Sequence, residues 1–173
     1  MQKLGLKFRV VDSGYREHHH KHLKPRELVK FLALGKARKA ALKYPNAIVI
    51  AADTVVAFNQ KILGKPKNKK DAYRTLNSLN GKINYVLTGM IVLDGQTGKI
   101  FQISTSAKVV FKKNSDSVIG NYINSGEPMD KAGSYAIFGR GLKLVKKIVG
   151  DRDAAIGLPV KDLKKVLKKL GSS

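Results

Sequence analysis

The chain has 173 residues, a length that suits one domain or two small lobes with a shared core. It contains no cysteine, which excludes disulfides and cysteine-ligated zinc, and no apolar run reaches the roughly 18 residues of a membrane span. Its 34 lysines and arginines against 12 aspartates and glutamates give a net charge of +22, so the expected partner is anionic: nucleic acid, a membrane surface or a polyphosphate. Residues 1–14 lack an apolar segment typical of a secretory signal, and we expect a cytoplasmic protein.

Hydrophobic periodicity predicts an alternation of strands and helices. In chain order, the pattern predicts a strand over 7–11, a helix over 26–44, strands over 47–58 and 61–63, a helix over 69–79, strands over 83–93 and 99–111, a helix over 115–123, a strand over 142–149 and a helix over 160–170. Loops are expected at 15–24, 125–133 and 150–159.

Local signals support several of these boundaries. Pro25 suits the first turn of a helix, and Asn68 can cap the helix that follows it. The nearly continuous apolar run 47–58 predicts a strand covered on both faces. Residues 94–98, Asp-Gly-Gln-Thr-Gly, have the composition of a hairpin turn. One continuous α/β unit is therefore expected.

Asp53 interrupts the most apolar strand of the sequence. An ionised carboxylate is costly there unless a metal ion or a cationic side chain compensates it, which makes Asp53 a candidate site residue. The alternative is a carboxylate at the end of the strand that only caps a turn. The sequence by itself leaves both interpretations open.

Two lysines and a glutamate are further candidates. Lys36 lies on the predicted helix among Leu32, Ala33 and Ala40, although a lysine that extends its ammonium to solvent is the alternative. Lys65 sits on a turn stiffened by the following proline, and a fixed ammonium suits phosphate. Glu17 could join Asp53 around a metal ion.

Four histidines, at positions 18, 19, 20 and 22, follow Glu17. Adjacent residues of an extended loop point in different directions, so we interpret this run as solvated rather than as a metal site.

Five blocks in this order resemble the Maf family, whose members are septum-formation-inhibitor-like nucleoside triphosphate pyrophosphatases. The blocks are Ala52-Asp53-Thr54-Val55-Val56, Leu63-Gly64-Lys65-Pro66, Leu79-Asn80-Gly81-Lys82, Glu127-Pro128-Met129-Asp130-Lys131-Ala132-Gly133-Ser134-Tyr135 and Gly157-Leu158-Pro159. The resemblance covers nearly the whole chain. It implies one Maf-like domain over 1–173, with a mixed twisted sheet flanked by helices, of the inosine-triphosphatase type, and a cleft between two lobes.

The resemblance also implies an activity and its residues. It implies hydrolysis of a nucleoside triphosphate, with dTTP, UTP or CTP as first choice, to the monophosphate and pyrophosphate, with magnesium or manganese and in a homodimer. By position, the implied catalytic residues are Asp53, Glu17, Lys36 and Lys65, the implied metal ligands are Asp53 and Glu17, and the implied substrate-binding residues are Thr54, Phe138, Lys131 and Tyr135.

Two features depart from the family pattern. Phe138 stands where the family usually has a glutamine that affects substrate choice, and stacking could replace hydrogen bonding there. The family's first strand and its Ser-x-Ser-Pro-Arg-Arg loop, which supplies serine and arginine to the phosphates, are not matched, because the similarity starts near residues 3–6. Each missing charge-assisted bond should cost roughly 1.5–3 kcal/mol, so we expect reduced or absent turnover.

Two other functions compete with hydrolysis. A nucleotide-binding regulator without turnover would retain the pocket and lose the reaction. A nucleic-acid-binding module would explain the charge, but no stripe of aromatic residues accompanies the basic residues, and we expect nucleic acid to bind only nonspecifically.

Overall fold

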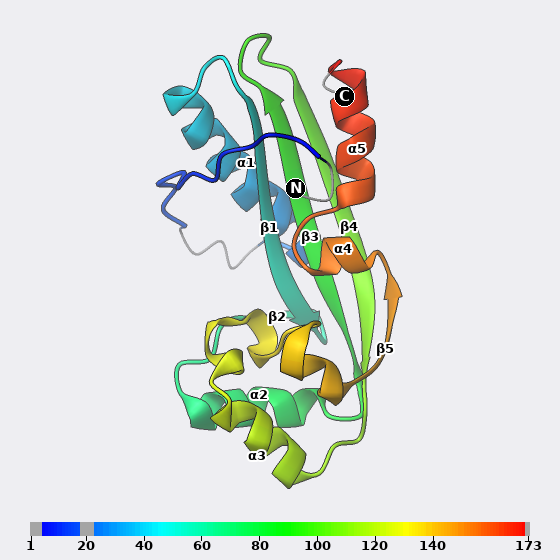
Figure 1. The fold of residues 1–173 in the computed structure, drawn as a ribbon. Coiled ribbons are helices and arrows are strands. Elements are labelled where there is room, and N and C mark those ends of the chain that lie inside the picture. Colours follow the sequence, from blue (N-terminus) through cyan, green and yellow to red (C-terminus); the bar gives the residue numbers. More distant parts are fainter. Residues whose placement is uncertain (1–4, 18–22, 172–173) are drawn as a thin grey trace.

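The computed structural model describes residues 5–17 and 23–171, in which a long twisted sheet carries helices on both faces (Figure 1). Its elements are α1 (Pro25–Lys43), β1 (Ile48–Phe58), β2 (Lys61–Leu63), α2 (Lys69–Leu79), β3 (Ile83–Asp94), β4 (Ile100–Phe111), α3 (Asp116–Asn124), the 3-10 helices η2 (Glu127–Asp130), η3 (Ala132–Ser134) and η4 (Gly139–Leu144), β5 (Val145–Gly150), α4 (Arg152–Ala155) and α5 (Val160–Lys169). The predicted α/β class is confirmed. Among these residues, no helix combines the length and the apolar character needed to cross a membrane.

The sheet has the strand order β2-β1-β3-β4-β5. A mixed sheet was expected, whereas every described strand pair is antiparallel. Strand β2 covers only Val56, Ala57 and Phe58 of β1, whose other long edge pairs with β3. Within the described residues, the β1 edge over 48–55 therefore has no strand partner.

Alternate residues of β1 face two different helices, as the period of a strand requires. Val49 packs with Ala33, Ala37 and Ala40 of α1. Ile48, Ile50 and Ala52 pack in the cluster that contains Leu163, Val166 and Leu167 of α5. The prediction that both faces of this strand are covered is confirmed.

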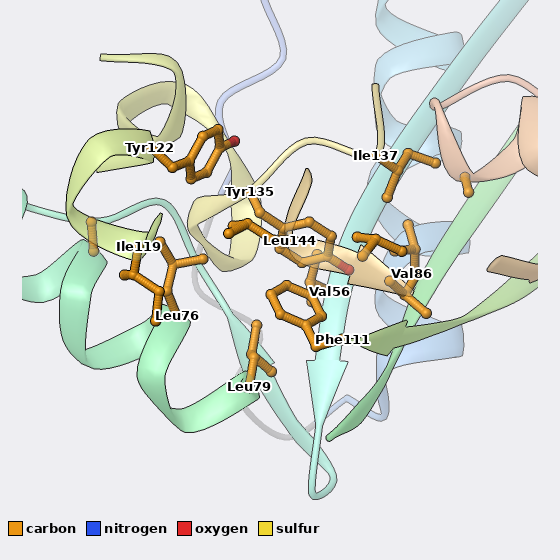
Figure 2. Close-up of a cluster of buried hydrophobic side chains, with 14 of the residues drawn as sticks. Val56, Leu76, Leu79, Val86, Phe111, Ile119, Tyr122, Tyr135, Ile137 and Leu144 are labelled. Carbon is orange, nitrogen blue, oxygen red and sulfur yellow. The ribbon is translucent and has the colours of Figure 1, made fainter. Parts of the chain in front are cut away.

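A second lobe is built around the other end of the sheet, where α2, α3 and the 3-10 helices lie in Figure 1. Its core joins helix residues such as Leu76 and Ile119 to the sheet residues Val56 and Phe111 (Figure 2). The ring of Phe111 meets that of Tyr135 edge to face, with the centroids 4.8 Å apart. The long strands β1, β3 and β4 therefore tie the two lobes together.

Four sequence predictions need correction. The predicted loop 125–133 contains the 3-10 helices η2 and η3. Residues 7–11 do not form a strand, because they join no hydrogen-bonded ladder with the described strands. The predicted strand 142–149 begins only at Val145, because Gly139–Leu144 forms the 3-10 helix η4. The predicted loop 150–159 contains the short helix α4, which Asp151 caps by accepting a hydrogen bond from the Ala154 amide. The histidine run 18–22 lies outside the described residues.

Gly89 lets α1 approach the backbone of the sheet. A Cβ atom built on Gly89 would lie 2.5 Å from both the carbonyl carbon and the carbonyl oxygen of Val29 in α1. Gly89 is also the register partner of Asp53 on β1. The missing side chain therefore sets the distance between α1 and the strand that carries Asp53.

Gly89→Ala should destabilise the fold, because backbone atoms of α1 would have to move away from the new methyl group. We expect a loss of about 1–3 kcal/mol in the free energy of unfolding, measured by urea denaturation. Gly120→Ala is the matched control: Gly120 lies in α3 with open space around it, so added helix propensity should leave stability unchanged or slightly raised. Equal stabilities of the two variants would contradict this packing account.

Candidate active site

Three charged side chains from separate segments meet at one point. The ammonium of Lys36 on α1 lies 2.7 Å from the Oε1 atom of Glu17, which precedes the helix, and it also donates a hydrogen bond to Oδ1 of Asp53 on β1. The structure thus brings together three of the four predicted catalytic residues. Both predicted metal-binding carboxylates are in this cluster.

Asp53 lies in the middle of β1, where it pairs with Gly89. Its side chain is only 12% exposed. The alternative that Asp53 caps a turn at the strand end is therefore wrong. The alternative that Lys36 extends into solvent is wrong as well, because its ammonium contacts two carboxylates.

Tyr15 and Gly35 hold the segment of Glu17 against α1. A Cβ atom built on Gly35 would lie 2.4 Å from two carbon atoms of the Tyr15 ring, so the ring packs where glycine leaves the helix bare. Gly35 directly precedes Lys36, and Tyr15 lies two residues before Glu17. This contact places the Glu17 carboxylate beside the Lys36 ammonium.

The cluster carries one positive and two negative charges, a net charge of −1. Burial raises the pKa of the Asp53 carboxyl above its usual value, the hydrogen bond from Lys36 opposes this, and the negative charge of Glu17 raises it further. Burial lowers the pKa of Lys36, but the hydrogen bonds and charges of Asp53 and Glu17 outweigh it, so the pKa is raised. The Lys36 ammonium stays charged, while the surplus negative charge favours a further cation.

The donor set fits a magnesium or manganese ion. Both ions prefer carboxylate oxygens, and magnesium commonly takes one or two protein carboxylates together with water and substrate phosphates. Asp53 and Glu17 already share one cation, the Lys36 ammonium, so their oxygens converge. In the described part of the chain, no cluster of three or more potential ligands of the His, Cys, Asp or Glu type occurs, so two protein carboxylates are the most this site offers.

A pocket of about 240 Å³ lies between the lobes, beside this cluster along β1. All the predicted substrate-binding residues and the fourth predicted catalytic residue line it: Thr54, Lys65, Lys131, Tyr135 and Phe138. The remaining predicted site residues therefore lie together at a second place, which begins one residue along β1 from Asp53.

The pocket residues differ in what they can offer a ligand. Phe138 is 46% exposed, so its ring face is accessible for stacking. Tyr135 is buried, and its hydroxyl donates to Oδ1 of Asn84 at 2.6 Å, so it contributes its ring to the wall. The Lys131 ammonium lies 2.7 Å from the Oδ2 atom of Asp130. Lys65 is exposed at the pocket rim.

A larger cleft of about 960 Å³ follows the β1 edge that has no strand partner among the described residues. Its walls come from residues 6–13, from Lys36 on α1, from residues 46–52 and from Leu158 and Leu167. Lys36 places the charged cluster at this cleft. The cleft therefore reaches Lys36, whose ammonium Asp53 and Glu17 share.

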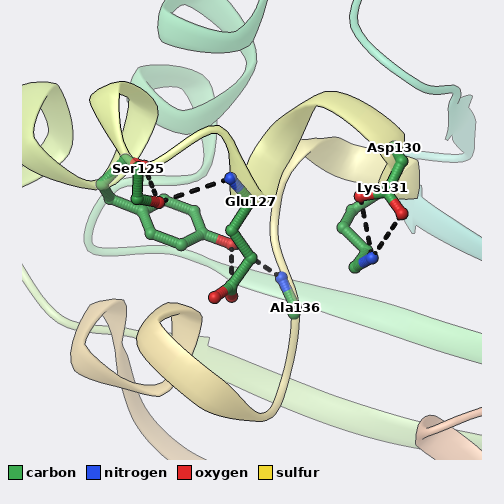
Figure 3. A network of polar contacts seen from close by, with 6 residues as sticks. Ser125, Glu127, Asp130, Lys131 and Ala136 are labelled. Atoms are coloured by element: carbon green, nitrogen blue, oxygen red, sulfur yellow. Dashed lines mark hydrogen bonds and ion pairs between the residues drawn. The ribbon is translucent and has the colours of Figure 1, made fainter.

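Glu127 is a residue that the sequence analysis did not single out. Its carboxylate accepts hydrogen bonds from the amides of Arg140 and Gly141, at 3.1 and 3.0 Å, and from the Tyr122 hydroxyl at 3.1 Å. The same hydroxyl accepts from the Ala136 amide (Figure 3). Glu127 therefore fixes both ends of the turn that carries Phe138. The available sequence signal was a glutamate between Gly126 and Pro128 in a predicted loop, where a carboxylate can accept from backbone amides.

The fold and the cluster define a two-lobed α/β protein with a carboxylate–lysine site beside an interlobe pocket. The family model for Maf-like proteins matches residues 1–170. The chain belongs to this family.

Several curated relatives are similar over almost the whole chain. The dTTP/UTP pyrophosphatase of Dictyoglomus thermophilum is 41% identical over 174 residues, which cover 100% of this chain and 90% of that protein. That of Methanococcoides burtonii is 41% identical over 170 residues, covering 98% and 87%. That of Alkaliphilus metalliredigens is 42% identical over 170 residues, covering 98% and 88%.

Glu127→Gln should loosen the pocket wall. An amide cannot accept all three hydrogen bonds, so one backbone amide or the Tyr122 hydroxyl loses its partner, and we expect about 1–3 kcal/mol less unfolding free energy. Thermal denaturation measures the loss. Asp162→Asn, which removes only the surface pair with Lys165, is the control and should change stability by less than about 1 kcal/mol. A Glu127 variant as stable as this control would show that the network does not hold the turn.

Proposed function

We propose that this protein is a nucleoside triphosphate pyrophosphatase that hydrolyses dTTP and UTP to the monophosphate and pyrophosphate. The observation that carries the proposal is the Lys36 ammonium held between Asp53 and Glu17 in the middle of a buried strand, next to the interlobe pocket. The names of the relatives support the same substrates, since each similar protein cited above is called a dTTP/UTP pyrophosphatase.

The two sides of β1 suit the two ends of a nucleotide. Successive strand residues point to opposite faces, so Asp53 faces α1 while Thr54 faces the pocket. We place the triphosphate at the charged cluster and the base in the pocket, stacked on Phe138. The ligand passes from one face to the other around the β1 edge over 48–55, which pairs with no strand in the part of the chain that the structure describes.

In this proposal, side chains of the protein accept the proton of the attacking water and compensate the negative charge of the phosphates. Asp53 accepts a proton from the water that attacks the α-phosphorus, while the bond between that phosphorus and the bridging oxygen of the pyrophosphate breaks. Its raised pKa makes it a stronger base than an exposed aspartate. Lys36 orients the carboxylate, and the exposed Lys65 at the pocket rim offers its ammonium to phosphate oxygens.

Asp53 and Glu17 would hold the divalent cation. When bound, such a cation neutralises phosphate charge and lowers the pKa of a coordinated water. A requirement for a divalent cation is directly testable. Pyrophosphate release from a panel of nucleoside triphosphates should need added magnesium or manganese and should stop with a chelator. A panel without any pyrophosphate release would overturn the proposed function.

Asp53→Asn should remove turnover and retain nucleotide binding. The amide cannot accept the proton, so kcat should fall by about a hundred- to ten-thousand-fold. Pyrophosphate release gives the rate, and calorimetry gives the affinity for dTTP. Asp116→Asn changes an exposed aspartate in the first turn of α3 and should keep the wild-type rate. Unchanged kcat in the Asp53 variant would exclude it as the proton acceptor.

The raised pKa of Asp53 can be measured without turnover. In the metal-free protein, the Asp53 carboxyl should titrate above 3.8, followed by carbon-13 NMR. Glu17→Gln removes a nearby negative charge and should lower the pKa of Asp53. The pKa of Asp53 is higher in the folded protein than in the unfolded chain. The contribution of Asp53 to stability therefore falls as the pH rises from the unfolded pKa through the folded pKa. An Asp53 pKa at or below 3.8 would contradict the electrostatic account.

A further inference from the structure

Two threonine hydroxyls and a backbone carbonyl form a chain of hydrogen bonds beside the pocket. Thr54 on β1 and Thr88 on β3 are register partners, and their Oγ1 atoms lie 2.7 Å apart. The Thr88 hydroxyl also donates to the carbonyl oxygen of Ala154 in α4, again at 2.7 Å. Thr88 is 1% exposed, so water does not compete for these bonds.

This arrangement fixes the direction of both protons. A hydroxyl has one proton and two lone pairs, and a carbonyl oxygen can only accept. The proton of Thr88 is therefore committed to Ala154, and Thr88 must accept at its contact with Thr54. The proton of Thr54 is then committed to Thr88. Toward any ligand in the pocket, the Thr54 hydroxyl presents lone pairs alone.

The other hydroxyl among the pocket-lining residues offers no proton to a ligand. It belongs to Tyr135, which donates its proton to Asn84. The rest of the pocket wall is largely apolar, with Val56, Val86 and Ile137 among its residues, and its charged side chains are Lys65, Asp130 and Lys131. In such surroundings, an acceptor that meets another acceptor stays unsatisfied, which disfavours the wrong ligand strongly.

We propose that Thr88 determines base selectivity by holding Thr54 as a hydrogen-bond acceptor for the ring N3–H of thymine or uracil. The inference rests on the proposed function, which supplies these two bases. On their pairing edge, thymine and uracil carry two carbonyl acceptors and one donor, N3–H, so an acceptor-only Thr54 can bind the edge through that donor. Cytosine has a lone pair at N3, which would face the lone pairs of Thr54.

Thr88→Val tests the inference because it removes the proton acceptor for Thr54 and nearly keeps the side-chain shape. The freed Thr54 hydroxyl can then donate to N3 of cytosine. The bases of dTTP and 5-methyl-dCTP have nearly the same size. We expect the preference for dTTP over 5-methyl-dCTP, measured as the ratio of their kcat/KM values, to fall about tenfold. Thr88→Ser retains the hydroxyl and should retain the wild-type preference, which separates selectivity from a general loss of packing.

Binding provides a readout that does not need turnover. In the Asp53→Asn background, the Kd values of dTTP and 5-methyl-dCTP should show the same preference, and adding Thr88→Val should reduce it about tenfold. If Thr88→Val does not fold, Thr54→Val should weaken dTTP binding about tenfold and leave 5-methyl-dCTP binding unchanged.

The outcomes separate the two proposals. A folded Thr88→Val protein with the wild-type preference, or a wild-type protein that binds the two nucleotides equally, would overturn the inference about Thr88. A wild-type protein that binds dTTP selectively but releases no pyrophosphate would overturn the proposed function and leave the selectivity inference supported.

Discussion

A carboxylate inside an apolar strand is stable only with a cation beside it, and the contact between Lys36 and Asp53 meets that need. Removing an ion from water is costly, so each of the two charges is less stable at this place without the other. The surrounding structure serves the contact: Gly89 lets α1 lie against the sheet, and Gly35 accepts the ring of Tyr15, which brings Glu17 to the same ammonium. The cluster thereby carries a surplus negative charge where a metal ion would be useful.

The alternation of β1 divides the site into two environments one residue apart. Asp53 belongs to the face of α1, and Thr54 belongs to the face of α4 and the interlobe pocket. In our two proposals, proton acceptance at Asp53 and base recognition at Thr54 are therefore separated by the thickness of a single strand. The proposed function depends on the β1 edge that has no strand partner among the described residues, because a ligand must pass around it to reach both faces.

Several features could not be predicted from local sequence. Residues 7–11 have a strand-like composition, but a strand also needs a partner edge, which is a property of the tertiary structure. The turn Gly139–Leu144 depends on Glu127, which is remote in sequence and binds the amides of Arg140 and Gly141. Thr88 looked like an ordinary strand residue, because its significance comes from Ala154, 66 positions further along the chain.

The sequence by itself determined the α/β class, the helix starts at Pro25 and after Asn68, and the presence of a carboxylate, Asp53, in an apolar strand. Propensity, capping and apolar periodicity act over a few neighbouring residues, so these features can be read locally. The resemblance to Maf proteins predicted the set of site residues. Only the tertiary structure decided which of them touch: Lys36 and Glu17 join Asp53, while Lys65, Thr54 and Phe138 lie at the pocket. The reason is physical, since charge compensation and proton direction depend on distances between residues that the chain brings together only by folding.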